Sequence, residues 1–107
     1  GIAARVPVPD GSVVDLFAEL GKSVTPEDVH AAIRSAAESK RMKGILQLMS
    51  TPVVSSDVIG NSHSSIFDPA FTSVTGGRYL KCLSWYDNEW GYSNRVCDLL
   101  GLLARWK

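Results

Sequence analysis

The chain has 107 residues, enough for one domain, and its eleven basic residues balance its eleven acidic ones. The formal net charge of zero argues against a general nucleic-acid binder or a basic membrane-surface protein, because neither would have the electrostatic attraction that it needs. The sequence has no apolar run near ~18 residues, so we expect no membrane span.

Apolar side chains alternate over residues 2–8 and again over residues 12–20, which is the period of a β-strand. Between these segments, the sequence PDG at 9–11 is a turn signal. We therefore expect the two segments to form an antiparallel hairpin with one buried face.

A helix is predicted to begin after Thr25, which is a good N-cap. Pro26 fits the first helical position, and the acidic residues that follow complement the helix dipole. Apolar residues then recur at helical spacing. We expect the helix to end within residues 38–44, where basic residues and a glycine supply stop signals.

The second half of the chain is predicted to consist mainly of strands before it ends in another helix. The strand candidates are short apolar segments at 44–49, 52–57 and 78–86, with one or two more around Pro69, while the polar residues 58–65 indicate a loop. Apolar residues at helical spacing predict the last helix over about 88–106. This order indicates an α+β fold, with both helices packed on one face of a largely antiparallel or mixed sheet.

The usual nucleophiles and metal ligands are isolated in this sequence. Cys82 lies in a predicted strand and Cys97 in a predicted helix, and neither has an evident base or positive field to make its thiol reactive. We therefore interpret both as small buried apolar residues. His30 and His63 lack further ligands at metal spacing, so we expect no metal site and interpret His63 as a hydrogen-bonding loop residue. The sequence contains no G-x-G-x-x-G motif, so the chain should carry no dinucleotide-binding fold of its own.

Arg5 is the only charged residue among the first eight. A guanidinium held on a rigid strand could bind a phosphate or a carboxylate with two hydrogen bonds. An exposed arginine on an edge strand is the plainer alternative.

The segment WYDNEWGYSNRV at 85–96 crowds carboxylates, amides and aromatics where a strand is expected to end and a helix to begin. Asp87 or Asn88 could simply cap that helix. The Asn88 amide could also pair with the primary amide of a ligand, Gly91 would let a flat ring approach the backbone, and Tyr92 offers an aromatic wall. These groups are what a nicotinamide would need to be held in one orientation.

Three segments of the sequence carry a resemblance to a known family. WYDNEWGYSNRVCDL begins at residue 85, RVPVPDGSVVDL spans 5–16, and VVSSD is followed by HSS within 53–65. In order and spacing they resemble segments of phosphorylating glyceraldehyde-3-phosphate dehydrogenase. The resemblance implies that residues 1–107 are the C-terminal portion of the catalytic domain of such an enzyme, without its Rossmann domain.

The resemblance implies an oxidoreductase that converts glyceraldehyde 3-phosphate, phosphate and NAD to 1,3-bisphosphoglycerate and NADH through a cysteine thioester. Arg5 corresponds to the family's phosphate-binding arginine, Asn88 to the asparagine that binds the nicotinamide carboxamide, and Tyr92 to an aromatic beside that ring. The family's S-C-T-T-N nucleophile segment and histidine base would precede Gly1. We therefore expect no catalytic residue in this chain, and no activity from it alone. At position 8 this chain has valine where the family more often has threonine, which leaves open a small change beside the phosphate site.

The resemblance further implies a cytoplasmic homotetramer that takes a phosphorylated aldehyde and phosphate, with no nucleic-acid or membrane partner; two cysteines also fit a reducing compartment. NADP stays possible, because cofactor choice depends on ribose-binding residues outside the chain. Two alternatives stay open: an erythrose-4-phosphate dehydrogenase, and a non-catalytic fragment that acts as an assembly or interaction module. The sequence begins without methionine and inside an apolar stretch, so we expect it to be part of a longer chain.

Overall fold

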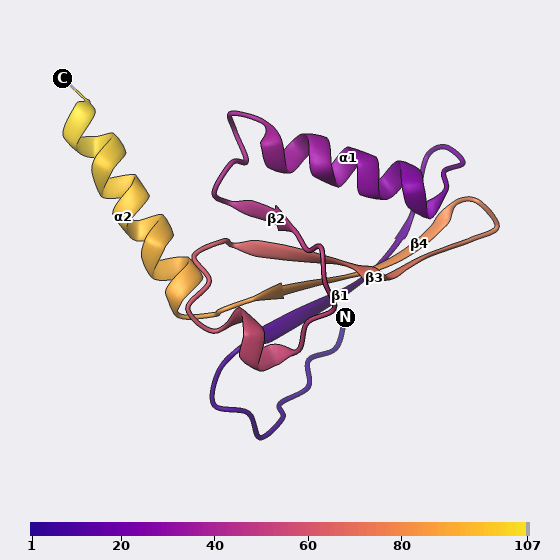
Figure 1. The fold of residues 1–107 in the computed structure, drawn as a ribbon, viewed down its shortest axis with the longest axis horizontal. Helices are drawn as coiled ribbons and strands as arrows, with labels where there is room; N and C mark the ends of the chain where they lie inside the picture. Colours follow the sequence, from indigo (N-terminus) through magenta and orange to yellow (C-terminus); the bar gives the residue numbers. More distant parts are fainter. Residues whose placement is uncertain (107) are drawn as a thin grey trace.

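The computed structural model describes residues 1–106, which form a four-stranded sheet with a helix packed against it and another helix extending from its end (Figure 1). The strands lie in the order β1-β4-β3-β2; β1 and β3 pair antiparallel with β4, and β2 pairs parallel with β3. Their bounds are β1 Ser12–Glu19, β2 Leu46–Leu48, β3 Ser65–Thr75 and β4 Tyr79–Tyr86. The predicted α+β class with a mixed sheet is confirmed.

The predicted hairpin at the N-terminus is wrong. Residues 1–11, all of which the structure describes, form no strand, and β1 pairs along its whole length with β4 near the other end of the chain. Pro7 and Pro9 have no N–H to give to a ladder, which disfavours strand pairing over the first segment. The expected buried face is also wrong, because Val14 and Leu16 are 50% and 48% exposed.

Helix α1, Pro26–Glu38, begins and ends where the sequence indicated. The Thr25 hydroxyl accepts the Asp28 N–H at 3.2 Å, and the Asp28 carboxylate accepts the Thr25 N–H at 2.9 Å, so the two residues form a capping box. The apolar side of α1 packs on Leu46, Phe67 and Cys82, which are the buried residues of the core cluster.

In the middle of the chain, one segment differs from expectation and another settles an open alternative. The strand expected over 52–57 is instead a short 3₁₀ helix, η1 Ser55–Val58, whose start is held by the Asp57 carboxylate as it accepts the Val54 N–H at 2.9 Å. The segment around Pro69 is one continuous strand, β3, with an irregular register between Asp68 and Ser73. The proline lies inside that irregularity, where a missing N–H is tolerated.

Helix α2, Trp90–Arg105, does not cover the face on which α1 packs. Figure 1 shows it projecting from the end of the sheet, away from α1. Of its sixteen described residues only Gly91 is buried, and Leu99, Leu100 and Leu103 are more than half exposed. The apolar stripe correctly predicted that this segment is a helix. The position of the helix, however, is fixed by the contacts of its first turns. Among residues 1–106, no helix has the length and apolar character that crossing a membrane requires.

Candidate functional site

The turn between β4 and α2 is organised around the carboxylate of Asp87, which is 2% exposed. Oδ1 accepts the N–H groups of Trp90 and Glu89 at 2.7 and 3.0 Å, and Oδ2 accepts the Gly60 N–H at 2.8 Å. Burial acts to raise the pKa of Asp87, but these backbone donors, together with a side-chain hydrogen bond with Asp10, outweigh it and hold the pKa below its ordinary value. Of the two cap candidates in the sequence, Asp87 is therefore the residue that caps α2.

Asn88 and Tyr92 both lie at this start of α2, and both are exposed, Tyr92 by 72%. The amide oxygen of Asn88 accepts the hydroxyl of Ser12 at 3.3 Å, which places Asn88 beside the first residue of β1. Tyr92 follows one helical turn later. The two residues that the sequence singled out for a nicotinamide thus share one end of one helix.

Gly91 has a different role from the one that its sequence context suggested. Its backbone is buried against the loop that precedes β3, and a Cβ atom there would lie 3.1 Å from the carbonyl oxygen of His63. The glycine therefore allows the helix, rather than a flat ring, to approach this backbone. The interpretation of Gly91 as room for a ligand is wrong for this geometry.

Arg95 holds the same helix from its second turn, and the sequence analysis missed it. Its Nη1 donates to the Ser64 hydroxyl at 3.1 Å and to the Gly44 carbonyl at 3.3 Å, while its Nε donates to Asp98 at 2.8 Å. An arginine in the middle of a helix usually belongs to a solvated face, so the sequence carried no signal for these contacts.

His63 is a hydrogen-bonding loop residue, as expected. The side-chain oxygen of Asn61 accepts its backbone N–H at 3.0 Å and lies 2.8 Å from its Nδ1. Burial, and then the positive charge of Arg95, lower the pKa of His63. The imidazole is therefore biased toward its neutral form.

Arg5 lies in the irregular N-terminal segment, and its side chain is exposed. The expectation of a guanidinium held on a rigid strand is wrong, because that segment forms no strand. Within residues 1–106, no hydrogen bond or ion pair joins Arg5 to Asn88 or Tyr92. Asn88 and Tyr92 therefore share the start of α2, while Arg5 belongs to the separate N-terminal segment.

The two cysteines differ in their surroundings. Burial, and then the nearby charge of Asp15, raise the pKa of the Cys82 thiol, while Lys81 acts in the opposite direction. A thiol with a raised pKa is a poor nucleophile at neutral pH. Cys97 is exposed on α2. The interpretation of both cysteines as small buried residues is therefore confirmed for Cys82 and wrong for Cys97.

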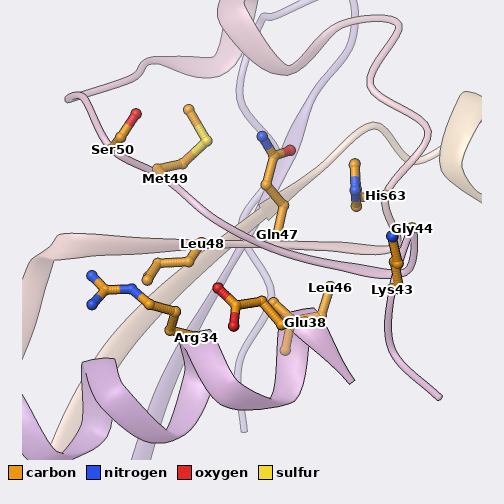
Figure 2. A pocket seen from close by; sticks show the side chains of 11 residues that line it. Arg34, Glu38, Lys43, Gly44, Leu46, Gln47, Leu48, Met49, Ser50 and His63 are labelled. Carbon is orange, nitrogen blue, oxygen red and sulfur yellow. The ribbon is translucent and has the colours of Figure 1, made fainter. Parts of the chain in front are cut away.

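Two clefts open beside α1. One, of about 430 Å³, lies along β2, and Figure 2 shows Arg34 and Glu38 on its α1 side and His63 on the other. The second, of about 530 Å³, is mainly apolar and lies between α1 and the sheet. Neither of these two clefts is lined by Arg5, Asn88 or Tyr92.

Comparison with known proteins decides the family. Residues 1–88 match the family described as the C-terminal domain of glyceraldehyde 3-phosphate dehydrogenase. The chain belongs to this family. Asn88 is the last residue of the matched segment, and Tyr92 lies just beyond it.

Curated relatives agree with this assignment to the glyceraldehyde-3-phosphate dehydrogenase family. The enzymes of that name from Mycobacterium avium and Mycolicibacterium smegmatis are 53% and 51% identical to this chain over 105 residues. That of Borreliella burgdorferi is 51% identical over 106 residues. Each alignment covers 98% of this chain but only 30% to 32% of the relative, so the chain spans about a third of the length of these relatives.

Proposed function

We propose that the chain is the C-terminal part of an NAD-dependent phosphorylating glyceraldehyde-3-phosphate dehydrogenase, with NADP as the alternative cofactor. The observation that carries this proposal is the family match over residues 1–88, reinforced by relatives of that name at about half identity. In this proposal the full-length protein is a cytoplasmic homotetramer in glycolysis, acting on a phosphorylated aldehyde and phosphate.

Within that enzyme, Asn88 would orient the nicotinamide. A primary amide offers both a donor and an acceptor, so it can pair with the carboxamide of the cofactor at both ends. The Ser12 hydroxyl uses one lone pair of the Asn88 oxygen and leaves the other, while the amide is exposed at an anchored turn. Tyr92, one turn further, would stand beside the ring as an aromatic wall.

The chemistry of the reaction divides between this chain and the rest of the protein. When bound, the nicotinamide cofactor would supply the hydride acceptor, whereas the cysteine nucleophile and the histidine base would come from outside residues 1–107. Asn88 and Tyr92 would hold the ring so that the correct face meets the substrate, and Arg5 would bind a phosphate group. This chain alone should therefore be inactive.

Substitution of Asn88 in the full-length enzyme tests the proposal. Asn88→Ala should weaken NAD binding only by about 0.5–1.5 kcal/mol, the worth of a neutral hydrogen bond. It should slow turnover more strongly, because a misoriented ring loses its near-attack geometry. The helix cap should survive, because Asp87 supplies it.

The matched control is Asn88→Asp, which keeps an acceptor for the Ser12 hydroxyl but loses the amide donor. Its thermal stability should stay near that of the unchanged enzyme while its turnover stays low. Turnover at the unchanged rate in Asn88→Ala would reject the nicotinamide role. NAD-dependent turnover of erythrose 4-phosphate but not of glyceraldehyde 3-phosphate by the unchanged full-length protein would favour an erythrose-4-phosphate dehydrogenase. A full-length protein that folds but never binds NAD would favour the non-catalytic module.

A further inference from the structure

The Asp87 carboxylate joins two segments that lie 27 residues apart in the sequence, the loop after η1 and the first turn of α2. One of its oxygens accepts the N–H groups of Trp90 and Glu89, and the other accepts that of Gly60. With all three donors satisfied by one almost fully buried group, the backbone from 87 to 90 has little freedom to shift.

Asn88 lies inside this fixed stretch of backbone and has little else to hold it. Its side chain is exposed, and the contact that its amide oxygen makes with the Ser12 hydroxyl is a long one, at 3.3 Å. The direction of the Asn88 side chain therefore depends on the backbone on either side of it. That backbone is set by Asp87.

We propose that Asp87 is a positioning residue for hydride transfer, which acts by fixing the turn that carries Asn88 and by coupling that turn to the loop at Gly60. This inference rests on the proposed role of Asn88 in orienting the nicotinamide. In this proposal Asp87 acts without contacting cofactor or substrate, because its carboxylate accepts three backbone N–H groups. Its effect on the reaction is transmitted through Asn88.

The substitution Asp87→Asn separates the two halves of this arrangement. The amide oxygen can still cap Trp90 and Glu89, but the amide nitrogen would face the Gly60 N–H as a second donor. The helix start is thus retained while the link to the loop is broken. Asp87→Ser, whose short side chain can still cap but cannot reach both segments, provides a second variant should the first fail to fold.

Asp68 provides a matched control in the same sheet. It is also a fully buried carboxylate, and its oxygens accept the Ala70 N–H at 3.0 Å and the Trp85 indole N–H at 3.1 Å. Among residues 1–106, none of its hydrogen bonds reaches the start of α2. Asp68→Asn should therefore disturb a buried carboxylate of the same kind without moving Asn88.

The experiment measures hydride transfer in a single turnover of the full-length enzyme, by the absorbance of NADH, together with the KM for the aldehyde and the unfolding temperature. Asp87→Asn should slow hydride transfer roughly ten- to a hundredfold while the KM for the aldehyde stays unchanged. The reason is that a nicotinamide ring misplaced by up to about 1 Å loses rate by such a factor. Asp68→Asn should lower the unfolding temperature but keep the hydride-transfer rate within about twofold, because none of its hydrogen bonds reaches the turn that carries Asn88.

A double variant distinguishes action through Asn88 from general damage. If Asp87 works through Asn88, adding Asp87→Asn to Asn88→Ala should slow hydride transfer no further. The inference would be overturned if the double variant slowed hydride transfer by the product of the two single-variant factors. It would also be overturned if Asp68→Asn slowed hydride transfer as much as Asp87→Asn does. Unchanged hydride transfer in Asp87→Asn, with Asn88→Ala slow, would overturn the inference and leave the proposed function standing. An unchanged rate in Asn88→Ala itself would overturn both.

Discussion

Replacing Gly91 by alanine should destabilise the protein, although alanine is the better helix former. A Cβ atom there would lie 3.1 Å from the carbonyl oxygen of His63 and 3.9 Å from the Cα of Ser64. The first distance is shorter than an ordinary van der Waals contact, so one of the two segments must move. The His63 backbone cannot retreat freely, because Asn61 accepts its N–H at 3.0 Å and also lies 2.8 Å from its ring.

Two opposing contributions decide the sign of the effect of Gly91→Ala. Forcing an extra methyl group into a tight site typically costs about 1–3 kcal/mol. Helix propensity favours alanine by roughly 1 kcal/mol in a helix interior, and by less near the helix start, where Gly91 lies. The expected net loss is about 0.5–2 kcal/mol in the free energy of unfolding.

Gly101→Ala is the matched control, because it introduces the same methyl group into the same helix. Apart from its chain neighbours and the adjacent backbone of its own helix, no atom of the described residues 1–106 comes within 4 Å of a Cβ placed at Gly101, so this variant should gain up to about 1 kcal/mol. Urea unfolding followed by tryptophan fluorescence compares both variants with the unchanged protein. A Gly91→Ala variant as stable as Gly101→Ala would refute the close packing of α2 on the loop before β3.

Three further predictions concern other parts of the chain. Thr25→Ala should lose about 1 kcal/mol of unfolding free energy through the capping box, and Thr25→Ser should keep most of it, as measured by urea unfolding. Arg5→Leu in the full-length enzyme should raise the KM for the phosphorylated aldehyde or for phosphate roughly ten- to a hundredfold; unchanged values for both would make Arg5 a plain surface residue. The pKa of His63 is lowered in the folded chain by burial and then by the charge of Arg95, so the unfolded chain binds a proton at this residue more readily than the folded chain does. The free energy of unfolding should therefore fall as the pH drops below about 6.5. His63→Gln should remove that pH dependence, and an equal slope in both proteins would contradict it.

Local sequence determined the features whose hydrogen bonds join residues only a few positions apart. The start of α1 could be predicted because Thr25 and Asp28 bond each other across three residues. The sequence narrowed the cap of α2 to Asp87 or Asn88 for the same reason, and the bond from the Trp90 N–H to Asp87 decides between them. The juxtaposition of Asn88 with Tyr92 also follows from the sequence, because they lie a helical turn apart.

Tertiary structure alone decided which segments meet and in which direction α2 leaves the sheet. The alternation in 12–20 indicates a strand but is the same for any partner, so it could not reveal that β1 pairs with β4 rather than with the preceding segment. The direction of α2 depends on the hydrogen bond that the Gly60 N–H donates to Asp87, 27 residues away, and on the one that Arg95 donates to the Gly44 carbonyl, 51 residues away. Contacts over such separations leave no periodic signal in the sequence. The role of Gly91 in backbone packing could be recognised only once the structure had brought α2 against the loop before β3.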